Sequence, residues 1–281
     1  MGWNRVFRDL LKRPTAVMGM VVLVLMVGGA VFAPWLAPHD PLDFQPANRL
    51  RAPDSEHLLG TDSFGRDILS RILWGGRTSL WCAVTAIVIG TALGTLIGLV
   101  AGYSGGRTDS LIMGFMDIMM AFPTLLLALT IVIVLGTSLF NLALAIGISN
   151  MPRFARLVRG EVLRVKSFDF VDGALALGAS TPRIMWRHIL PNILAALIVM
   201  VSLRVSVAIL IEASLNFLGL GVPPPAPTWG GMVAEGQKFL LFAPWLATAP
   251  GAAIALIVLA LNFVGDGLRD ALDPRLKNSE V

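Results

Sequence analysis

Six apolar runs, each close to the length of a bilayer-crossing helix, constrain this chain more than any other feature. The hydrocarbon core of a membrane needs about 20 predominantly apolar residues in helical conformation. The sequence therefore predicts an all-α integral membrane protein with six transmembrane helices. The first run is longer than the apolar core of a cleavable signal peptide, which favours an uncleaved anchor. The six predicted spans cover residues 16–36, 80–101, 111–135, 139–158, 193–215 and 247–264.

Charge is scarce along the chain, which agrees with this prediction. Only 14% of the residues are charged, against roughly 25% in soluble domains, so a surface that faces water throughout cannot be built. The pI of about 9.8 does not indicate nucleic acid, because a basic patch on a soluble face is missing from the pattern. Cys82 is the single cysteine, which excludes a disulfide framework. We expect residues 1–281 to form one transmembrane domain.

Lysine and arginine are distributed unevenly between the segments that join the runs. Cytoplasmic loops of membrane proteins carry an excess of these residues. With the N-terminus inside and residues 153–190 counted as an inner segment, 15 of the 22 fall in inner segments, six in outer segments and one, Arg204, within a span. The count predicts that both termini and residues 159–192 are cytoplasmic, and that residues 37–79 and 216–246 are external. The expected location is the cytoplasmic (inner) membrane of a bacterium.

Few ionisable residues lie inside the predicted spans. Asp117 lies in the third, and Arg204 and Glu212 lie in the fifth; such groups are candidates for function and face protein or water rather than lipid. Arg204 and Glu212 are separated by about 12 Å along a straight helix, so they are not natural partners of each other. The spans contain no series of acidic residues that would relay protons, which weighs against a secondary transporter.

Glycines recur every fourth residue in the second predicted span, at Gly90, Gly94, Gly98 and Gly102. Residues spaced by four lie near one helix face, where small side chains allow a neighbouring backbone to approach closely. The pattern predicts a helix-packing face. A face that slides during gating would use the same residues, and the sequence does not separate the two.

The sequence carries no pattern that indicates an enzyme. His39, His57 and His188 are scattered and show no metalloprotease spacing. No lysine follows a glycine, so the glycine-lysine step of a phosphate-binding loop does not occur. We expect a non-catalytic subunit that binds no metal or cofactor. If ATP drives the protein, another subunit must bind the ATP and its magnesium.

The stretch FVDGALALGASTPRIMWRHILPN, residues 170–192, predicts a helical elbow. An apolar ridge lies on a first short helix that Gly178 ends, as glycine often does. Ser180 or Thr181 is expected to cap a second helix with Pro182 at its first position, and that helix is expected to end at Pro191. Arg183 and Arg187 would share a face. The elbow fits a cytoplasmic knob for a partner, or a helix that lies on lipid headgroups. The apolar ridge consists of Phe170, Val171, Ala174, Leu175 and Leu177.

Two external segments are predicted to be more than connectors. Residues 37–79 are long and mixed in charge, which favours a role in receiving a soluble binding protein or covering a pore mouth. The candidate residues are Asp62, Arg66, Asp67 and Arg71. The sequence VPPPAPTWGG within residues 216–246 cannot be a spanning helix, because consecutive prolines remove donors. Trp229 and Trp245 suit the membrane interface.

The elbow resembles the E-A-A loop of ABC-importer permeases. Asp172, Gly173 and Ala174 occupy the first three places of that pattern, with Asp in place of Glu and Gly in place of Ala. Gly178 occupies the place of the pattern's glycine, and His188, Leu190 and Pro191 close it. The resemblance implies the type I ABC-importer fold and a loop that docks in a cleft of an ATP-hydrolysing subunit. The docking residues implied are Asp172, Gly173, Ala174, Leu177, Gly178, Ala179, Ser180, Arg183, Arg187 and His188.

Three further stretches are similar to the dipeptide/oligopeptide/nickel branch of this family. They are HLLGTDSFGRDILSRILWGGRTSL, LNFLGLGVPPPAPTWGGMV and LNFVGDGLRDALDPRLK. That branch implies the second type of permease subunit, which works with a homologous permease, two ATP-hydrolysing subunits and a periplasmic or lipid-anchored binding protein. Short peptides are the expected cargo; nickel, glutathione and opine-like or modified peptides remain alternatives. A scaffold protein or an ion-driven transporter are the rivals outside this family.

Overall fold

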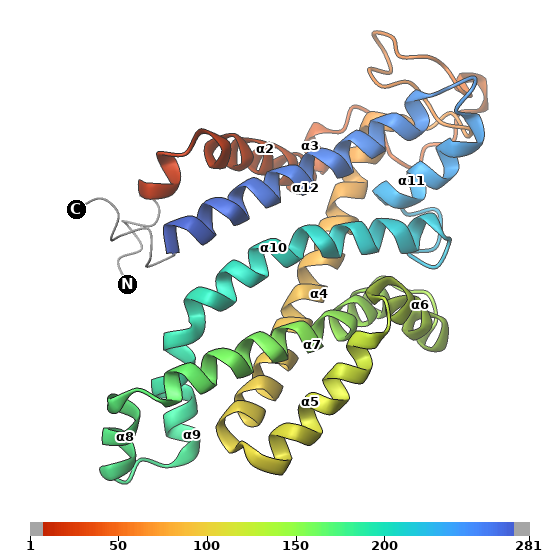
Figure 1. The fold of residues 1–281 in the computed structure, drawn as a ribbon. Helices are drawn as coiled ribbons and strands as arrows, with labels where there is room; N and C mark the ends of the chain where they lie inside the picture. The colour runs from red at the N-terminus through yellow and green to blue at the C-terminus, as the bar shows by residue number, and fades with distance from the viewer. Residues whose placement is uncertain (1–7, 273–281) are drawn as a thin grey trace.

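The computed structural model describes residues 8–272, and the part of the chain that it describes is almost entirely helical. Figure 1 shows long helices that run obliquely past one another, with α8 and α9 at one end and residues 37–67 and α11 at the other. The long helices are α2 (Pro14–Val31), α4 (Ile68–Ser104), α7 (Leu139–Lys166), α10 (Leu190–Phe217) and α12 (Trp245–Leu272). The shorter ones are α3 (Ala33–Leu36), α5 (Gly106–Ala121), α6 (Thr124–Leu135), α8 (Asp169–Ala176), α9 (Thr181–Arg183) and α11 (Trp229–Gly236), with single turns at Pro46–Asn48, Ile184–Ile189 and Gln237–Phe239.

Four helical segments are long and apolar enough to cross a membrane. Within residues 8–272 they are Pro14–Val31, Ile68–Ser104, Thr181–Phe217 and Trp245–Leu272. The first holds residues 16–31 of the predicted span 16–36, and the other three contain the second, fifth and sixth predicted spans. The prediction of six spans is not confirmed: the described part of the chain contains four candidate spans, or five if the bent pair α5 and α6 is one span.

The third predicted span is not one straight helix. The chain breaks after Ala121, and α5 and α6 meet at 94°. Pro123 lies in the break with Phe122 before it in an extended conformation, as steric contact with the proline ring requires. α5 also begins at Gly106, five residues before the predicted start. This segment is therefore a broken span or a re-entrant hairpin.

The fourth predicted span lies in α7, which does not meet the length and hydropathy criterion. Asn141, Asn150 and Arg153 interrupt its apolar sequence. α7 instead packs along α4, and its contact face includes Ala143, Ile146 and Phe154, all fully buried. α7 therefore buries one face against neighbouring helices of the bundle and carries polar residues along the rest of its length.

The second predicted span is the middle of a longer helix. α4 begins at Ile68, so the last 12 residues of the predicted external segment 37–79 are helical rather than connecting chain. Asp67 caps this helix, because its carboxylate accepts a 2.8 Å hydrogen bond from the Ser70 amide. The non-helical part of that segment is therefore residues 37–67, with one 3-10 turn, and we call it the polar cap.

The predicted external segment 216–246 is also partly helical. α10 continues to Phe217, and α11 occupies Trp229–Gly236 between the prolines and α12. The side chain of Thr228 caps α11 by accepting a hydrogen bond from the Gly231 amide. The proline-rich stretch itself is non-helical, in agreement with the sequence prediction.

The main apolar core lies between α4, α7, α10 and α12. It includes Ile87, Phe154, Ile209 and Ile257. Large apolar side chains elsewhere remain exposed, such as Val24 on α2 and Val134 on α6. Exposed apolar side chains on spanning helices are the surface that lipid or a partner helix covers.

Candidate functional site

The α8–α9 elbow follows α7 and lies at the end of the molecule opposite the polar cap (Figure 1). Gly178 has a φ of +77°, a conformation that glycine adopts without strain. The Gly178 amide donates to the carbonyl of Leu175 at 2.9 Å, and the Ala179 amide donates to that of Ala174 at 3.0 Å. These two bonds are the Schellman arrangement that ends a helix, so the prediction that Gly178 ends α8 is confirmed.

Buried apolar side chains hold the elbow to the bundle. Val171 on α8 and Ile184 and Ile189 in the following turn are fully buried in the main core. α8 contacts both the end of α7 and the turn Ile184–Ile189. The elbow is therefore anchored through three positions and is not a loose surface loop.

The outer side of the elbow is exposed and apolar. Leu177 is 90% exposed, although burying a leucine side chain contributes about 1.5–3 kcal/mol. Phe170, Leu175 and Trp186 are exposed as well. The predicted ridge therefore divides in two, with Val171 buried inside and Phe170, Leu175 and Leu177 facing outward. The exposure of Trp186 on the elbow was not predicted from the sequence, and only its position within residues 170–192 could have suggested it.

The predicted docking residues lie together on this elbow. Gly173, Gly178 and Ser180 are exposed with Asp172, Arg183 and Arg187, whereas Ala174, Ala179 and His188 are partly buried. No ion pair or side-chain hydrogen bond forms to Asp172, Arg183 or Arg187 from residues 8–272. The elbow thus presents one carboxylate and two guanidinium groups that are free of partners within the described chain.

Two details of the predicted second helix are wrong. The Ser180 side chain makes no capping hydrogen bond; only its carbonyl accepts, from the Ile184 amide. The helix does not end at Pro191 either, because Thr181–Phe217 is one continuous helical segment of 37 residues. Its residues Ile184–Ile189 form a π-helical turn, which changes the register in which Arg183 and Arg187 were expected to share a face.

The polar cap contains an ion-pair network that ties it to α11. Asp62 accepts a 2.7 Å hydrogen bond from Nε of Arg66, and Nε of Arg71 lies 3.4 Å from the same carboxylate oxygen. Both arginines also reach Glu235 on α11, at 3.2 and 3.3 Å. The network joins the cap, the first turn of α4 and α11. Glu235 was missed in the sequence, because nothing local indicates a contact across more than 160 residues.

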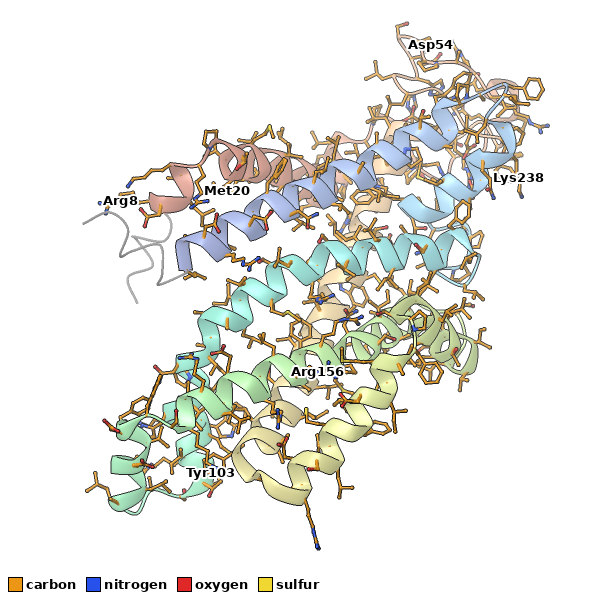
Figure 2. All side chains as sticks on the ribbon, in the orientation of Figure 1. Arg8, Met20, Asp54, Tyr103, Arg156 and Lys238 are labelled. Atoms are coloured by element: carbon orange, nitrogen blue, oxygen red, sulfur yellow. The ribbon has the colours of Figure 1, made fainter. Side chains whose placement is uncertain are left out.

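All four residues predicted for this segment are buried. Asp62, Arg66, Asp67 and Arg71 are each at most 8% exposed. They therefore shape the cap from within, and any contact with a soluble receptor must use other residues of the cap. Asp54 lies at the outer tip of this end of the molecule, with Lys238 on the neighbouring loop (Figure 2). A hydrogen bond from the His57 amide lowers the pKa of the Asp54 carboxyl below its usual value.

Glu212 lies at the junction of α10, α4 and α11. Its side chain is fully buried, and one carboxylate oxygen accepts hydrogen bonds from the Ser79 hydroxyl at 2.9 Å and from the Asn216 amide at 2.7 Å. Trp229 adds a third link, since its indole Nε1 donates to the Ile72 carbonyl at 2.9 Å. Trp229 is only 1% exposed, so its predicted place at the membrane interface is wrong.

The other two intramembrane candidates behave differently. Asp117 on α5 pairs with Arg156 on α7, and both side chains are more than half exposed; Figure 2 shows Arg156 on the same face of the bundle as α5. Arg204 is partly buried and forms no ion pair within residues 8–272. Arg204 and Glu212 do not contact each other, as the sequence predicted. A second pair that sequence reasoning missed is Asp109 with Arg159, joined at 2.7 Å.

The four predicted glycines of α4 lie against α7. A Cβ at Gly98 would lie 2.5 Å from the carbonyl oxygen of Ala155, and contacts of 2.5–2.8 Å with atoms of α7 arise at Gly90, Gly94 and Gly102. The two helices therefore approach too closely for any larger side chain. The close fit describes packing, and a sliding motion along this face stays a prediction.

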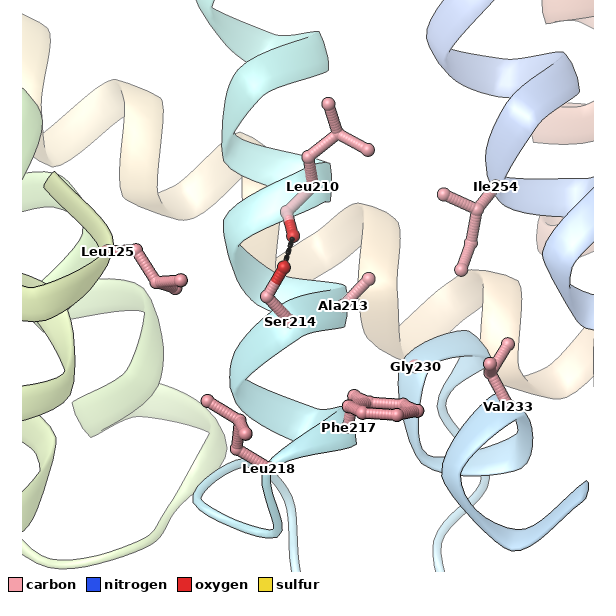
Figure 3. A pocket seen from close by; sticks show the side chains of 9 residues that line it. All are labelled: Leu125, Leu210, Ala213, Ser214, Phe217, Leu218, Gly230, Val233 and Ile254. Atoms are coloured by element: carbon pink, nitrogen blue, oxygen red, sulfur yellow. Dashed lines mark hydrogen bonds between the residues drawn. The ribbon is translucent and has the colours of Figure 1, made fainter. Parts of the chain in front are cut away.

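An apolar groove of about 400 Å³ lies between α6, α10, α11 and α12. Figure 3 shows Leu125 on α6 across from Leu210 and Ser214 on α10, with Phe217 and Val233 at one end. The Ser214 hydroxyl donates to the Leu210 carbonyl at 2.7 Å, so it is already used within the helix. The groove suits a lipid chain or an apolar helix better than a peptide backbone, which needs polar partners.

Comparison with known proteins identifies the class to which this arrangement of helices belongs. Residues 94–278 match the model of the family described as binding-protein-dependent transport system inner membrane component, and residues 3–53 match the N-terminal transmembrane domain of oligopeptide transport permease C. The chain therefore belongs to the family of inner-membrane permease components of binding-protein-dependent transport systems. It is a non-catalytic, multi-pass subunit of the ABC-importer type.

Curated relatives are similar over nearly the whole chain. The dipeptide transport system permease protein DppC of Alkalihalophilus pseudofirmus is 45% identical over 98% of this chain and 91% of the relative. The glutathione transport system permease protein GsiD of Pectobacterium atrosepticum is 42% identical over 98% and 92%. The di/tripeptide transport system permease protein DppC of Pseudomonas aeruginosa is 46% identical over 93% and 88%.

A solved structure shows the same fold. A chain of the MetNI methionine ABC transporter, solved in inward-facing conformations, aligns with a TM-score of 0.51 and 17% identity. The alignment covers 69% of this chain and 94% of that one. At this identity the likeness extends to the fold alone.

Proposed function

We propose that this chain is the second-type permease of an ATP-driven importer for short peptides. It forms the translocation pathway with a homologous permease, and a binding protein delivers cargo at the side of the polar cap. Dipeptides, di/tripeptides and glutathione are named for its relatives, and all of these are short peptides. Both termini and the elbow are cytoplasmic in this proposal. Its support is the lysine and arginine count, together with the position of the elbow opposite the cap (Figure 1).

The exposed elbow is the observation that carries the mechanism. Leu177 is 90% exposed and lies on a segment that Val171 and Ile184 anchor to the bundle. The same segment exposes the charged side chains of Asp172, Arg183 and Arg187. An exposed apolar side chain among charged groups on an anchored segment is typical of a surface that another protein covers. We propose that each ATP-hydrolysing subunit receives such an elbow in a cleft. When these subunits close on ATP and magnesium, their displacement moves the elbow and biases the permease between outward-open and inward-open states.

The docking role is tested by replacing single exposed residues of the elbow. Leu177→Glu should abolish co-purification of the ATP-hydrolysing subunits and ATP-driven uptake, because it places a charge at the centre of the contact. Leu241→Glu is the matched control: Leu241 is also 90% exposed but lies between α11 and α12, beside the cap. Equal loss in both variants, or recovery of the subunits with Leu177→Glu, would overturn the docking role.

Gly178→Pro gives an independent test of the elbow's shape. Proline fixes φ near −65°, whereas Gly178 requires +77°, so the Schellman turn cannot form. We expect membrane insertion to persist and recruitment of the ATP-hydrolysing subunits to fail. Normal recruitment of the ATP-hydrolysing subunits would show that their binding does not depend on the conformation of the elbow.

Substrate and energy source are tested together in proteoliposomes that contain the whole transporter. Radiolabelled dipeptide should accumulate only with ATP on the side of the ATP-hydrolysing subunits, and glutathione and Ni²⁺ serve as competitors. Competition by Ni²⁺ rather than by peptides would reassign the cargo. Uptake that continues without ATP but collapses with an ion gradient would favour a secondary transporter.

A further inference from the structure

A cluster of two histidines and one aspartate lies inside the polar cap, away from the network around Asp62. His39, His57 and Asp67 place one potential metal-ligating atom each within 4.8 Å of one another. Nδ1 of His57 lies 3.0 Å from Oδ1 of Asp67, and Nδ1 of His39 lies 3.8 Å from the same oxygen. Residues that are scattered in the sequence therefore converge at the start of α4.

The charge of Asp67 is the first argument for a cation. Asp67 is 2% exposed, and no lysine or arginine within residues 8–272 forms an ion pair with it. One carboxylate oxygen is used by Ser70, which donates from its amide at 2.8 Å and from its hydroxyl at 2.7 Å. The other oxygen is hydrogen-bonded to Nδ1 of His57 at 3.0 Å and lies 3.8 Å from Nδ1 of His39. Buried charges in proteins are paired or coordinate metals, so this carboxylate needs a positive partner at the imidazole side.

The second argument is the unsatisfied imidazole. Nδ1 of His39 is buried and has no hydrogen-bond partner within the described chain. The backbone of His39 is fixed, because its amide donates to the Ser70 hydroxyl at 3.1 Å. Its ring lies 4.7 Å from that of His57, centroid to centroid. The ring is therefore held with a free nitrogen aimed at the carboxylate.

Two of the three separations between the ligand atoms are close to those around a small transition-metal ion. Zinc binds histidine nitrogen at about 2.0–2.1 Å and carboxylate oxygen at about 2.0–2.2 Å, so tetrahedral ligand atoms lie roughly 3.3 Å apart. The distances of 3.0 and 3.8 Å to Asp67 lie on either side of this value. Ligation through Nδ1 leaves Nε2 of His57 to donate. In the structure Nδ2 of Asn48 lies 3.5 Å from that nitrogen and donates to Oε1 of Gln45 at 2.7 Å, so ligation of an ion would turn the Asn48 and Gln45 amides together.

We propose that His39, His57 and Asp67 form a binding site for Zn²⁺ or a similar borderline divalent ion, with a water at the fourth position. The ion would clamp the chain that follows α3 to the first turn of α4 and so stiffen the polar cap. This proposal does not depend on the identity of the transported cargo. It concerns a resident ion of the cap, and its test does not measure transport.

Zinc binding by the full-length protein tests the site. The protein is purified in detergent without a polyhistidine tag, stripped with a chelator, and titrated with Zn²⁺ against a chromophoric zinc competitor. We expect one ion per chain, together with a rise in Tm when zinc is present. His39→Ala should weaken binding beyond the roughly 10–100-fold that follows removal of a residue that only orients a ligand.

Matched variants separate ligation from folding. His188→Ala removes the third histidine of the chain, which lies in the elbow at a similar degree of burial, and should leave zinc affinity unchanged. His39→Ala changes a side chain that is 29% exposed, so the protein should fold, which its Tm without zinc will show. X-ray absorption at the zinc edge should detect two imidazoles. Absence of stoichiometric binding, or affinity unaltered in His39→Ala, would overturn the proposal.

Discussion

The α8–α9 elbow and the polar cap use the same kinds of side chain in opposite ways. In the elbow, charged groups such as Asp172 and Arg187 are exposed, and the anchors are apolar. In the cap, charged groups such as Asp62 and Arg66 are buried and paired, while Leu58 and Phe64 are exposed. An exposed charge without a partner costs little and is available to a second protein, whereas a buried pair is costly to break. The difference separates a surface made for association from a segment held together from within.

The largest effect should follow from removing the central carboxylate of the cap. Asp62→Ala leaves Arg66 and Arg71 buried with only Glu235 as a counter-ion, and breaking a buried pair costs about 3–5 kcal/mol. We expect a large fall in Tm and rapid proteolysis of residues 37–67.

The control is Glu56→Ala in the same segment. Glu56 is 56% exposed and pairs with Arg51, and exposed pairs contribute little to stability, so no measurable change is expected. Similar Tm values for the two variants would show that the cap is not held by its buried charges.

A smaller effect is expected where α4 meets α7, which connects the two regions. Gly98→Ala places a Cβ 2.5 Å from the carbonyl oxygen of Ala155, and overpacking of this kind costs about 1–3 kcal/mol. Gly114→Ala on α5 is the control, since nothing lies within 4 Å of its Cβ position. That variant should be neutral or gain up to about 1 kcal/mol from better helix propensity. Thermal unfolding in detergent would measure both, and equal stability would exclude a close glycine contact.

In the elbow, one variant of α8 should lower stability and a neighbouring one should not, and this difference separates folding from association. Val171→Ala removes part of a fully buried anchor and should cost about 1–3 kcal/mol. Leu175→Ala changes a side chain that is 46% exposed, so stability should stay within about 0.5 kcal/mol.

Association should show the reverse order in the same pair of variants. Leu175→Ala should weaken binding of the ATP-hydrolysing subunits more than Val171→Ala does, when both are measured by co-purification at a temperature where both remain folded. If Leu175→Ala proved the more destabilising variant, the division of α8 into an inner and an outer face would be wrong.

The sequence predicted those parts of the fold that depend on neighbouring residues, such as apolar runs and the glycine that ends a helix. The apolar runs 80–101, 193–215 and 247–264, and residues 16–31 of the run 16–36, lie in helices that are apolar enough to span, and Gly178 ends α8 as expected. The break between α5 and α6 had a signal in Pro123, but an apolar sequence on both sides concealed it. The fourth predicted span, in α7, is not confirmed, because α7 is not among the helices apolar enough to span; periodicity alone does not distinguish a helix buried in protein from one buried in lipid.

Contacts between distant residues could not be predicted. Glu235 meets Arg66 across 169 residues, and His39 meets Asp67 only because the cap folds back on the start of α4. Trp229 was expected at the interface because of its residue type, whereas its indole donates to a carbonyl of α4. In each case the sequence supplied the right chemistry, and tertiary packing decided its location.

The continuous segment Thr181–Phe217 has a mechanical consequence. It carries the elbow at one end and Glu212, bonded to Ser79 on α4, near the other. A helix of 37 residues measures about 56 Å at 1.5 Å per residue. In the proposed docking role this segment is a lever, because a tilt of about ten degrees of a straight helix of this length carries its far end by roughly 10 Å. The π-helical turn at Ile184–Ile189 lies at the elbow end of the lever. Its stiffness would therefore determine how much of a movement at the elbow reaches Glu212.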